Sequence, residues 1–111
     1  MTQELIDTAV FEELADAMGA DFAAELVTTF LSDAPNMFAE MTQALATRDA
    51  DAYRRAAHSI KSNAQVFGAT LLADQARDIE MATMTADASA LTALQTNFDQ
   101  TADVLKALLD E

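Results

Sequence analysis

Residues 53–68 read YRRAAHSIKSNAQVFG, and this stretch decides the fold. Wound as an α-helix of about 3.6 residues per turn, it separates into an apolar face and a polar face. The apolar face forms a stripe with helical spacing that can pack on other helices. Its members are Tyr53, Ala56, Ala57, Ile60, Ala64 and Phe67. The pattern therefore predicts an amphipathic helix that is buried along one side.

The polar face carries His58, the only histidine in the chain. Arg54, Arg55, Lys61 and Ser62 all lie within one helical turn of it. These positions predict an exposed imidazole flanked by cations, which disfavour its protonated form and attract an anion. A lone histidine can also be an ordinary residue without a special function, and the spacing alone leaves that alternative open.

The segment HSIKSNAQVFG, residues 58–68, resembles the phosphorylation motif of histidine-containing phosphotransfer (HPt) domains, the modules of bacterial and eukaryotic phosphorelays. That motif has a histidine, a lysine three positions later, then a glycine, a small residue, and a glycine ten positions after the histidine. His58, Lys61, Ala64 and Gly68 match it, while Ser62 replaces the commoner glycine. The chain length, the apolar pattern and the segment LLADQARDIE, residues 71–80, extend the resemblance over nearly the whole chain.

The resemblance implies that His58 carries a phosphoryl group. Lys61, together with Arg54 or Arg55, is expected to offset the charge of the phosphoryl oxygens, because phosphoryl transfer requires mainly positioning and charge neutralisation. The resemblance also assigns the position twenty-two residues after the histidine, here Glu80, to a hydrogen bond with the other ring nitrogen. Glu80 could equally be an ordinary surface glutamate.

Small residues beside the histidine are expected to leave clearance for a docking partner. We assign this role to Ala57, Ser62, Ala64 and Gly68. Gln65 lies about two turns along the same face as His58 and could contact phosphate or partner, although an exposed polar residue without a role is the simpler interpretation.

The composition predicts an all-α fold. Two glycines and one proline in 111 residues leave few tight turns, and Ala, Leu, Glu, Asp and Met favour helices. We expect one domain over residues 1–111, an antiparallel four-helix bundle with a short additional N-terminal helix. The chain has no cysteine, no apparent signal segment and no long apolar run, so we expect a soluble, cytoplasmic monomer.

The charge balance excludes two classes of partner. Nineteen acidic residues against six basic residues give a net charge of −13, whereas nucleic acids and anionic membranes require cationic patches. The resemblance implies protein partners instead: receiver domains of response regulators, and hybrid or histidine kinases. We expect no metal site and no cofactor of the chain's own, with Mg²⁺ and the acceptor aspartate supplied by the receiver.

Capping signals predict the limits of the first helices. A short helix should begin at Asp7 or Thr8 and end at Gly19. A longer helix capped by Asp21 should then kink or restart at Pro35, because proline removes a backbone donor. The inward positions expected in these two segments are Val10, Phe11, Leu14, Met18, Phe22, Leu26, Phe30, Ala34, Met37, Phe38, Met41 and Leu45.

The remaining limits follow in the same way. Asp49 should cap the histidine helix, Gly68 should end it, and another helix should follow from Thr70. Residues 85–89 are expected to form a loop before the last helix. The inward positions expected after Thr70 are Leu72, Ala76, Ile79, Ala82, Leu91, Leu94, Phe98, Ala102, Leu105 and Leu108 or Leu109.

Autonomous catalysis is not expected. The chain has no glycine-rich phosphate loop for a kinase, and one histidine without cysteine supplies neither a metal site nor a hydrolase triad. The favoured interpretation is a phosphocarrier that depends on catalysis by its partner. Two alternatives remain open at this stage: a helical docking protein that carries no phosphate, and a phosphatase acting on phospho-aspartate.

Overall fold

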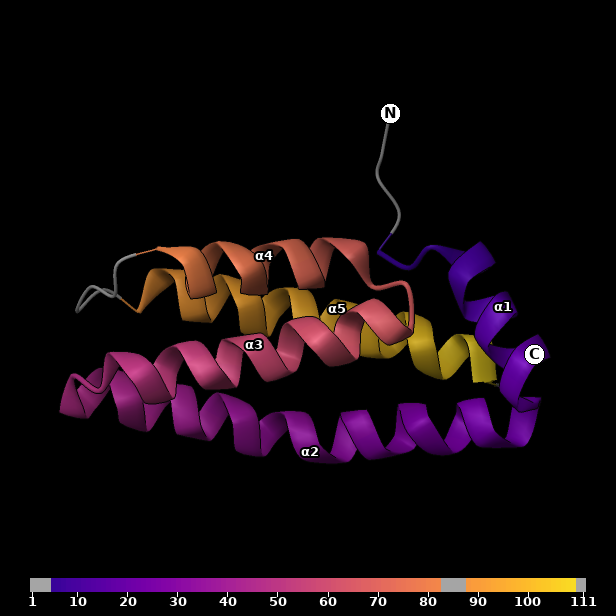
Figure 1. The fold of residues 1–111 in the computed structure, drawn as a ribbon, viewed down its shortest axis with the longest axis horizontal. Helices are drawn as coiled ribbons and strands as arrows, with labels where there is room; N and C mark the ends of the chain where they lie inside the picture. The colour runs from indigo at the N-terminus through magenta and orange to yellow at the C-terminus, as the bar shows by residue number, and fades with distance from the viewer. Residues whose placement is uncertain (1–4, 83–87, 110–111) are drawn as a thin grey trace.

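The computed structural model describes residues 5–82 and 88–109, and every regular element within these ranges is an α-helix. The helices are α1 (Thr8–Met18), α2 (Ala20–Thr47), α3 (Ala50–Val66), α4 (Thr70–Met81) and α5 (Ser89–Leu109). The four longer helices lie side by side with alternating directions, and α1 lies at one end of them (Figure 1). The expected all-α bundle with a short additional N-terminal helix is confirmed.

Side-chain caps fix the starts of α1 and α3 as expected. Asp7 accepts a hydrogen bond from the Ala9 amide at 3.1 Å, and Asp49 accepts one from the Ala52 amide at 3.1 Å. The expected cap at Asp21 was wrong, because Gly19 ends α1 and α2 starts immediately at Ala20. Asp21 instead lies in the first turn of α2, where its negative charge interacts favourably with the positive end of the helix dipole.

Helix α2 continues through Pro35, so the expected restart at the proline was wrong. Proline removes one intrahelical hydrogen bond, but buried residues lie on both sides of it in the same helix. Phe30, Ala34 and Phe38 are all at most 5% exposed, and we infer that their packing keeps the two halves in one continuous helix.

The core is built around aromatic contacts between α2, α5 and the end of α3. The Phe30 ring stacks on Phe67 with centroids 5.6 Å apart. Phe98 meets Phe30 edge to face at 5.5 Å and Phe38 at 5.3 Å. These contacts hold the histidine helix against the long helix, so its apolar face is fixed inward and its polar face outward.

Three expected core positions are exposed, namely Met18 (54%), Phe22 (40%) and Ala82. They lie in the last turn of α1, in the first turn of α2 and just after α4. The apolar periodicity of the sequence extends to these positions, but no neighbouring helix covers them. The pattern also missed seven buried residues, which are Ile6, Ala23, Val27, Ala44, Ala69, Ala73 and Thr101.

The predicted loop over residues 85–89 lies mostly outside the described residues. Ser89 itself is the first residue of α5, so the expected end of the loop was late by one residue. Within residues 5–82 and 88–109, no helix has the length and apolar character needed to cross a membrane.

Candidate functional site

The site is centred on His58, which lies on the outward face of α3. Its side chain is 56% exposed, whereas the neighbouring Ala57 and Ile60 on the opposite face are fully buried. The exposed imidazole expected from the helical pattern is therefore confirmed. A partner can reach this ring without unfolding any part of the bundle.

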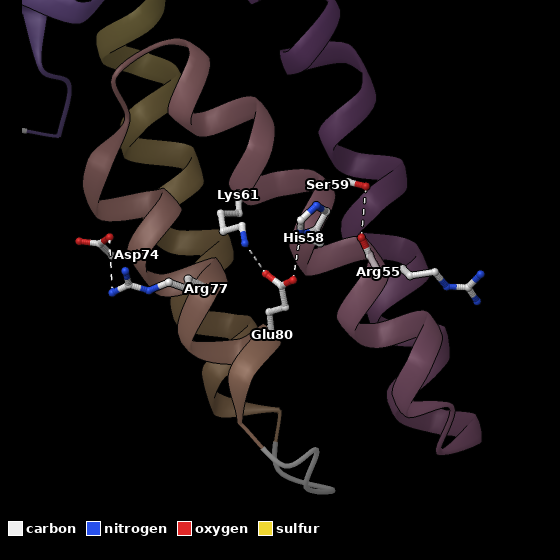
Figure 2. Close-up of polar contacts among 7 residues, drawn as sticks. All are labelled: Arg55, His58, Ser59, Lys61, Asp74, Arg77 and Glu80. Carbon is white, nitrogen blue, oxygen red and sulfur yellow. Dashed lines mark hydrogen bonds and ion pairs between the residues drawn. The ribbon is translucent and has the colours of Figure 1, made fainter.

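Glu80 of α4 binds two side chains of α3 at once (Figure 2). Its Oε1 lies 2.8 Å from His58 Nδ1, and its Oε2 lies 2.7 Å from Lys61 Nζ. Helices α3 and α4 pack together more extensively than any other pair, and this packing brings the three groups together. The expected contact between Glu80 and the histidine ring is confirmed.

This contact fixes the tautomer of the histidine. An ionised carboxylate can only accept hydrogen bonds, so Nδ1 of His58 must carry the ring proton and donate a hydrogen bond to Glu80. The other ring nitrogen, Nε2, then keeps its lone pair when the imidazole is neutral. A neutral nitrogen with a free lone pair on an exposed ring is a competent nucleophile.

Electrostatics keep the Glu80 carboxyl ionised. The Lys61 ammonium is the largest cause that lowers its pKa below the usual value, burial opposes this, and the contact with His58 lowers the pKa further. Because the folded-state pKa is lowered, the stabilisation from these contacts is present above the ordinary carboxyl pKa. It is lost as the pH falls through the lowered pKa.

The remaining polar candidates do not join this cluster. Arg54 is half-buried, and the Arg55 Nε donates to a backbone carbonyl one turn earlier at 3.4 Å. Gln65 is exposed, and its side chain makes no hydrogen bond to the described residues, although its backbone carbonyl accepts one from the Gly68 amide at 3.2 Å. Arg77 of α4, which the sequence did not single out, lies 3.9 Å from Asp74, and both are more than half exposed. A pair of this kind contributes little to stability.

Three of the four residues expected to give a partner clearance are buried instead. Ala57 and Ala64 are 0% exposed because they lie on the packed face of α3, and Gly68 is buried as well. The space above Gly68 is occupied by the chain itself, since an added Cβ would lie 2.6 Å from the Asp7 carbonyl oxygen. The docking role expected for these three was wrong, and of the four residues only Ser62 is exposed.

An open groove of about 640 Å³ runs between α2 and α3 next to the site. Alanines of both helices form much of its lining, and Arg55 and Ser59, the neighbours of His58 on α3, lie along it. Glu40 of α2 and Asp49 add negative charge to the same groove. Within the described residues, no group of three histidine, aspartate or glutamate side chains could hold a metal ion.

Comparison with known proteins agrees with this geometry. Residues 25–110 match the family model of the Hpt domain. Among solved structures, the chain is similar to histidine-containing phosphotransfer protein B (HptB) from Pseudomonas aeruginosa PAO1, with a TM-score of 0.77 and 26% sequence identity. The match covers 98% of this chain and 94% of that one. No curated protein sequence matches this chain.

Proposed function

The chain belongs to the Hpt domain family, and from this premise we propose that it is a histidine phosphotransfer protein of a two-component phosphorelay, with His58 as the residue that carries the phosphoryl group. The observation that carries the proposal is the 2.8 Å contact between His58 Nδ1 and Glu80. It leaves Nε2 of a half-exposed ring as the nucleophilic atom.

In the proposed reaction, Nε2 of His58 accepts a phosphoryl group from the aspartyl phosphate of a receiver domain, or from a kinase, and later passes it to a receiver aspartate. Phosphoryl transfer requires in-line positioning and neutralised charge. The receiver supplies the Mg²⁺ and the aspartate, whereas this chain supplies the nucleophile and its orientation. It therefore works as a phosphocarrier that depends on catalysis by the partner.

Incubation with a phosphorylated receiver domain tests the proposal against its two alternatives. A phosphocarrier acquires an acid-labile phosphoryl group in amounts close to one per chain. A docking protein binds the receiver without acquiring label. A phosphatase releases inorganic phosphate from many receivers per chain. Either of the last two results would overturn the proposed function.

Replacement of Glu80 should slow phosphoryl transfer without unfolding the bundle. In Glu80→Ala the ring proton is no longer held on Nδ1, so a smaller fraction of His58 presents a lone pair on Nε2. A charge-assisted hydrogen bond contributes about 1.5 to 3 kcal/mol, reduced here by partial exposure, which corresponds to a rate loss of about ten-fold. Transfer reactions quenched at successive times measure the rate, and ¹⁵N NMR of the imidazole measures the tautomer.

Asp78→Ala is the matched control for Glu80→Ala, because it removes the same charge from an exposed position of α4. It should leave both the rate and the imidazole spectrum unchanged. The assignment of Glu80 fails if Glu80→Ala keeps the wild-type tautomer and transfers phosphate at the wild-type rate.

Ser62 is the position at which a large side chain should block docking. It is exposed one turn after His58, so Ser62→Trp should change the free energy of unfolding by only about 0.5 kcal/mol. The indole should still prevent a receiver from bringing its aspartate within bonding reach of the ring. Thr92→Trp, at an exposed position of α5, should fold and dock normally. Undiminished receiver binding by Ser62→Trp would show that the partner approaches from another side.

A further inference from the structure

Lys61 does not stand free beside the histidine. Its side chain is only 19% exposed, and its ammonium lies 2.7 Å from Oε2 of the carboxylate whose other oxygen holds His58 (Figure 2). The lysine is therefore placed to act on the carboxylate that orients the ring. This position differs from the expectation that Lys61 directly neutralises the phosphoryl oxygens.

On the premise of the proposed function, the geometry points to Lys61 as a positioning residue that acts on His58 through Glu80. It weakens the hydrogen bond between that carboxylate and the phosphorylated ring. The phosphoryl group on His58 then becomes easier to pass on. In this role Lys61 sets how readily phosphohistidine gives up its phosphoryl group, and it does not bind the phosphoryl group itself.

The balance of the transfer step shows why the carboxylate matters. The Nε2 lone pair of neutral His58 forms the N–P bond, while the P–O bond to the receiver aspartate breaks and its electron pair stays on the aspartate oxygen. The proton on Nδ1 remains in place, so the ring gains a unit of positive charge. Glu80, 2.8 Å from Nδ1, stabilises that charge and hence the phosphorylated form.

The ammonium of Lys61 opposes this stabilisation. A carboxylate that already neutralises one cation is a weaker acceptor for the proton of a second one. The lowered pKa of Glu80, with Lys61 as its largest cause, agrees with such a weakening. Removal of Lys61 should therefore stabilise phosphohistidine, whereas removal of a lysine that binds phosphate would destabilise it. The two roles predict opposite signs.

A competition experiment measures this sign. Equal amounts of the wild-type chain and Lys61→Met, one of which is phosphorylated beforehand through the receiver and a small-molecule phosphodonor that is then removed, are mixed with a catalytic amount of the receiver domain and Mg²⁺. The receiver exchanges phosphoryl groups between the two chains until they reach equilibrium. Its own properties therefore do not affect the final ratio of the two phosphorylated chains. Intact-mass spectrometry measures the phosphorylated fraction of each chain, and mixtures labelled initially on either chain must converge on one ratio.

We expect the phosphoryl group to favour Lys61→Met over wild type by about five-fold, a coupling typical of residues in direct contact. The same comparison made between Glu80→Gln and the double variant Lys61→Met/Glu80→Gln should show a preference below about two-fold, since the carboxylate that transmits the effect is gone. Lys106→Met, which removes a charge from α5, should compete equally with wild type.

The outcomes separate this inference from the proposed function. Phosphoryl groups that accumulate on the wild-type chain, or a five-fold preference for Lys61→Met that persists without Glu80, would overturn the action of Lys61 through Glu80 and leave His58 as the carrier. Absence of any phosphoryl group on wild-type His58 would overturn the proposed function, and the inference with it.

Discussion

His58→Gln should fold normally and lose all phosphoryl uptake. No other histidine exists in the chain, so no second imidazole can replace the lost nucleophile. The side chain is 56% exposed and makes one side-chain hydrogen bond, so its replacement should change the free energy of unfolding by about 1 kcal/mol or less. Circular dichroism and urea unfolding measure the fold, and incubation with a phosphorylated receiver measures the uptake.

Gln65→Ala provides the control for this variant. It alters an exposed polar residue of the same helix, and we expect it to retain uptake because Gln65 contacts no part of the cluster in the described structure. Phosphoryl label that persists on His58→Gln would refute the assignment of the carrier residue. Loss of uptake accompanied by loss of helical signal would point to a structural role for the histidine instead.

The sequence was sufficient to place His58 because its position depends only on helical periodicity. The apolar stripe from Tyr53 to Phe67 fixes one face of α3 inward, and His58 then points outward whichever helices cover the stripe. The contact with Glu80 required more than periodicity. It followed from the family spacing of twenty-two residues, which carries information on how α3 and α4 pack.

The pairing of Lys61 with Glu80 could not be predicted in the same way. Helical spacing places Lys61 one turn from His58, but it does not say which neighbouring helix lies within reach of the lysine. Only the packing of α4 beside α3 shows that the ammonium meets a carboxylate at 2.7 Å. A basic residue near a proposed phosphate site was therefore assigned to the phosphate, when its partner in the fold is the glutamate.

Gly68 shows the same limit, because the motif identifies the glycine but not what occupies the space above it. Its backbone has a positive φ of 75°, and its carbonyl accepts a hydrogen bond from the Asp7 amide at 2.7 Å. A Cβ at this position would lie 2.6 Å from the Asp7 carbonyl oxygen and 2.9 Å from the Val10 Cβ. The glycine thus lets the start of α1 rest directly on the end of the histidine helix. All of α1 precedes residues 25–110, the part that matches the family model.

Gly68→Ala should therefore destabilise the protein and loosen α1. The left-handed backbone costs about 1 to 2 kcal/mol for a residue with a Cβ, and displacement of the Asp7 backbone adds to this. We expect a total loss of about 2 to 4 kcal/mol in the free energy of unfolding, measured in urea. Hydrogen exchange should show the location of the effect, because the Asp7 amide loses its acceptor when the two segments separate.

Gly19→Ala separates the steric effect from the backbone effect. Gly19 also has a positive φ, of 92°, but no atom lies within 4 Å of the position that a Cβ would occupy. This variant should lose stability through backbone strain alone, while the Asp7 amide keeps its wild-type protection. If Gly68→Ala also left that amide protected, the glycine would not be the contact that holds α1 to the bundle. Faster exchange at Asp7 in Gly68→Ala alone would establish that contact, since the two variants share a strained backbone and differ in what their added methyl group meets.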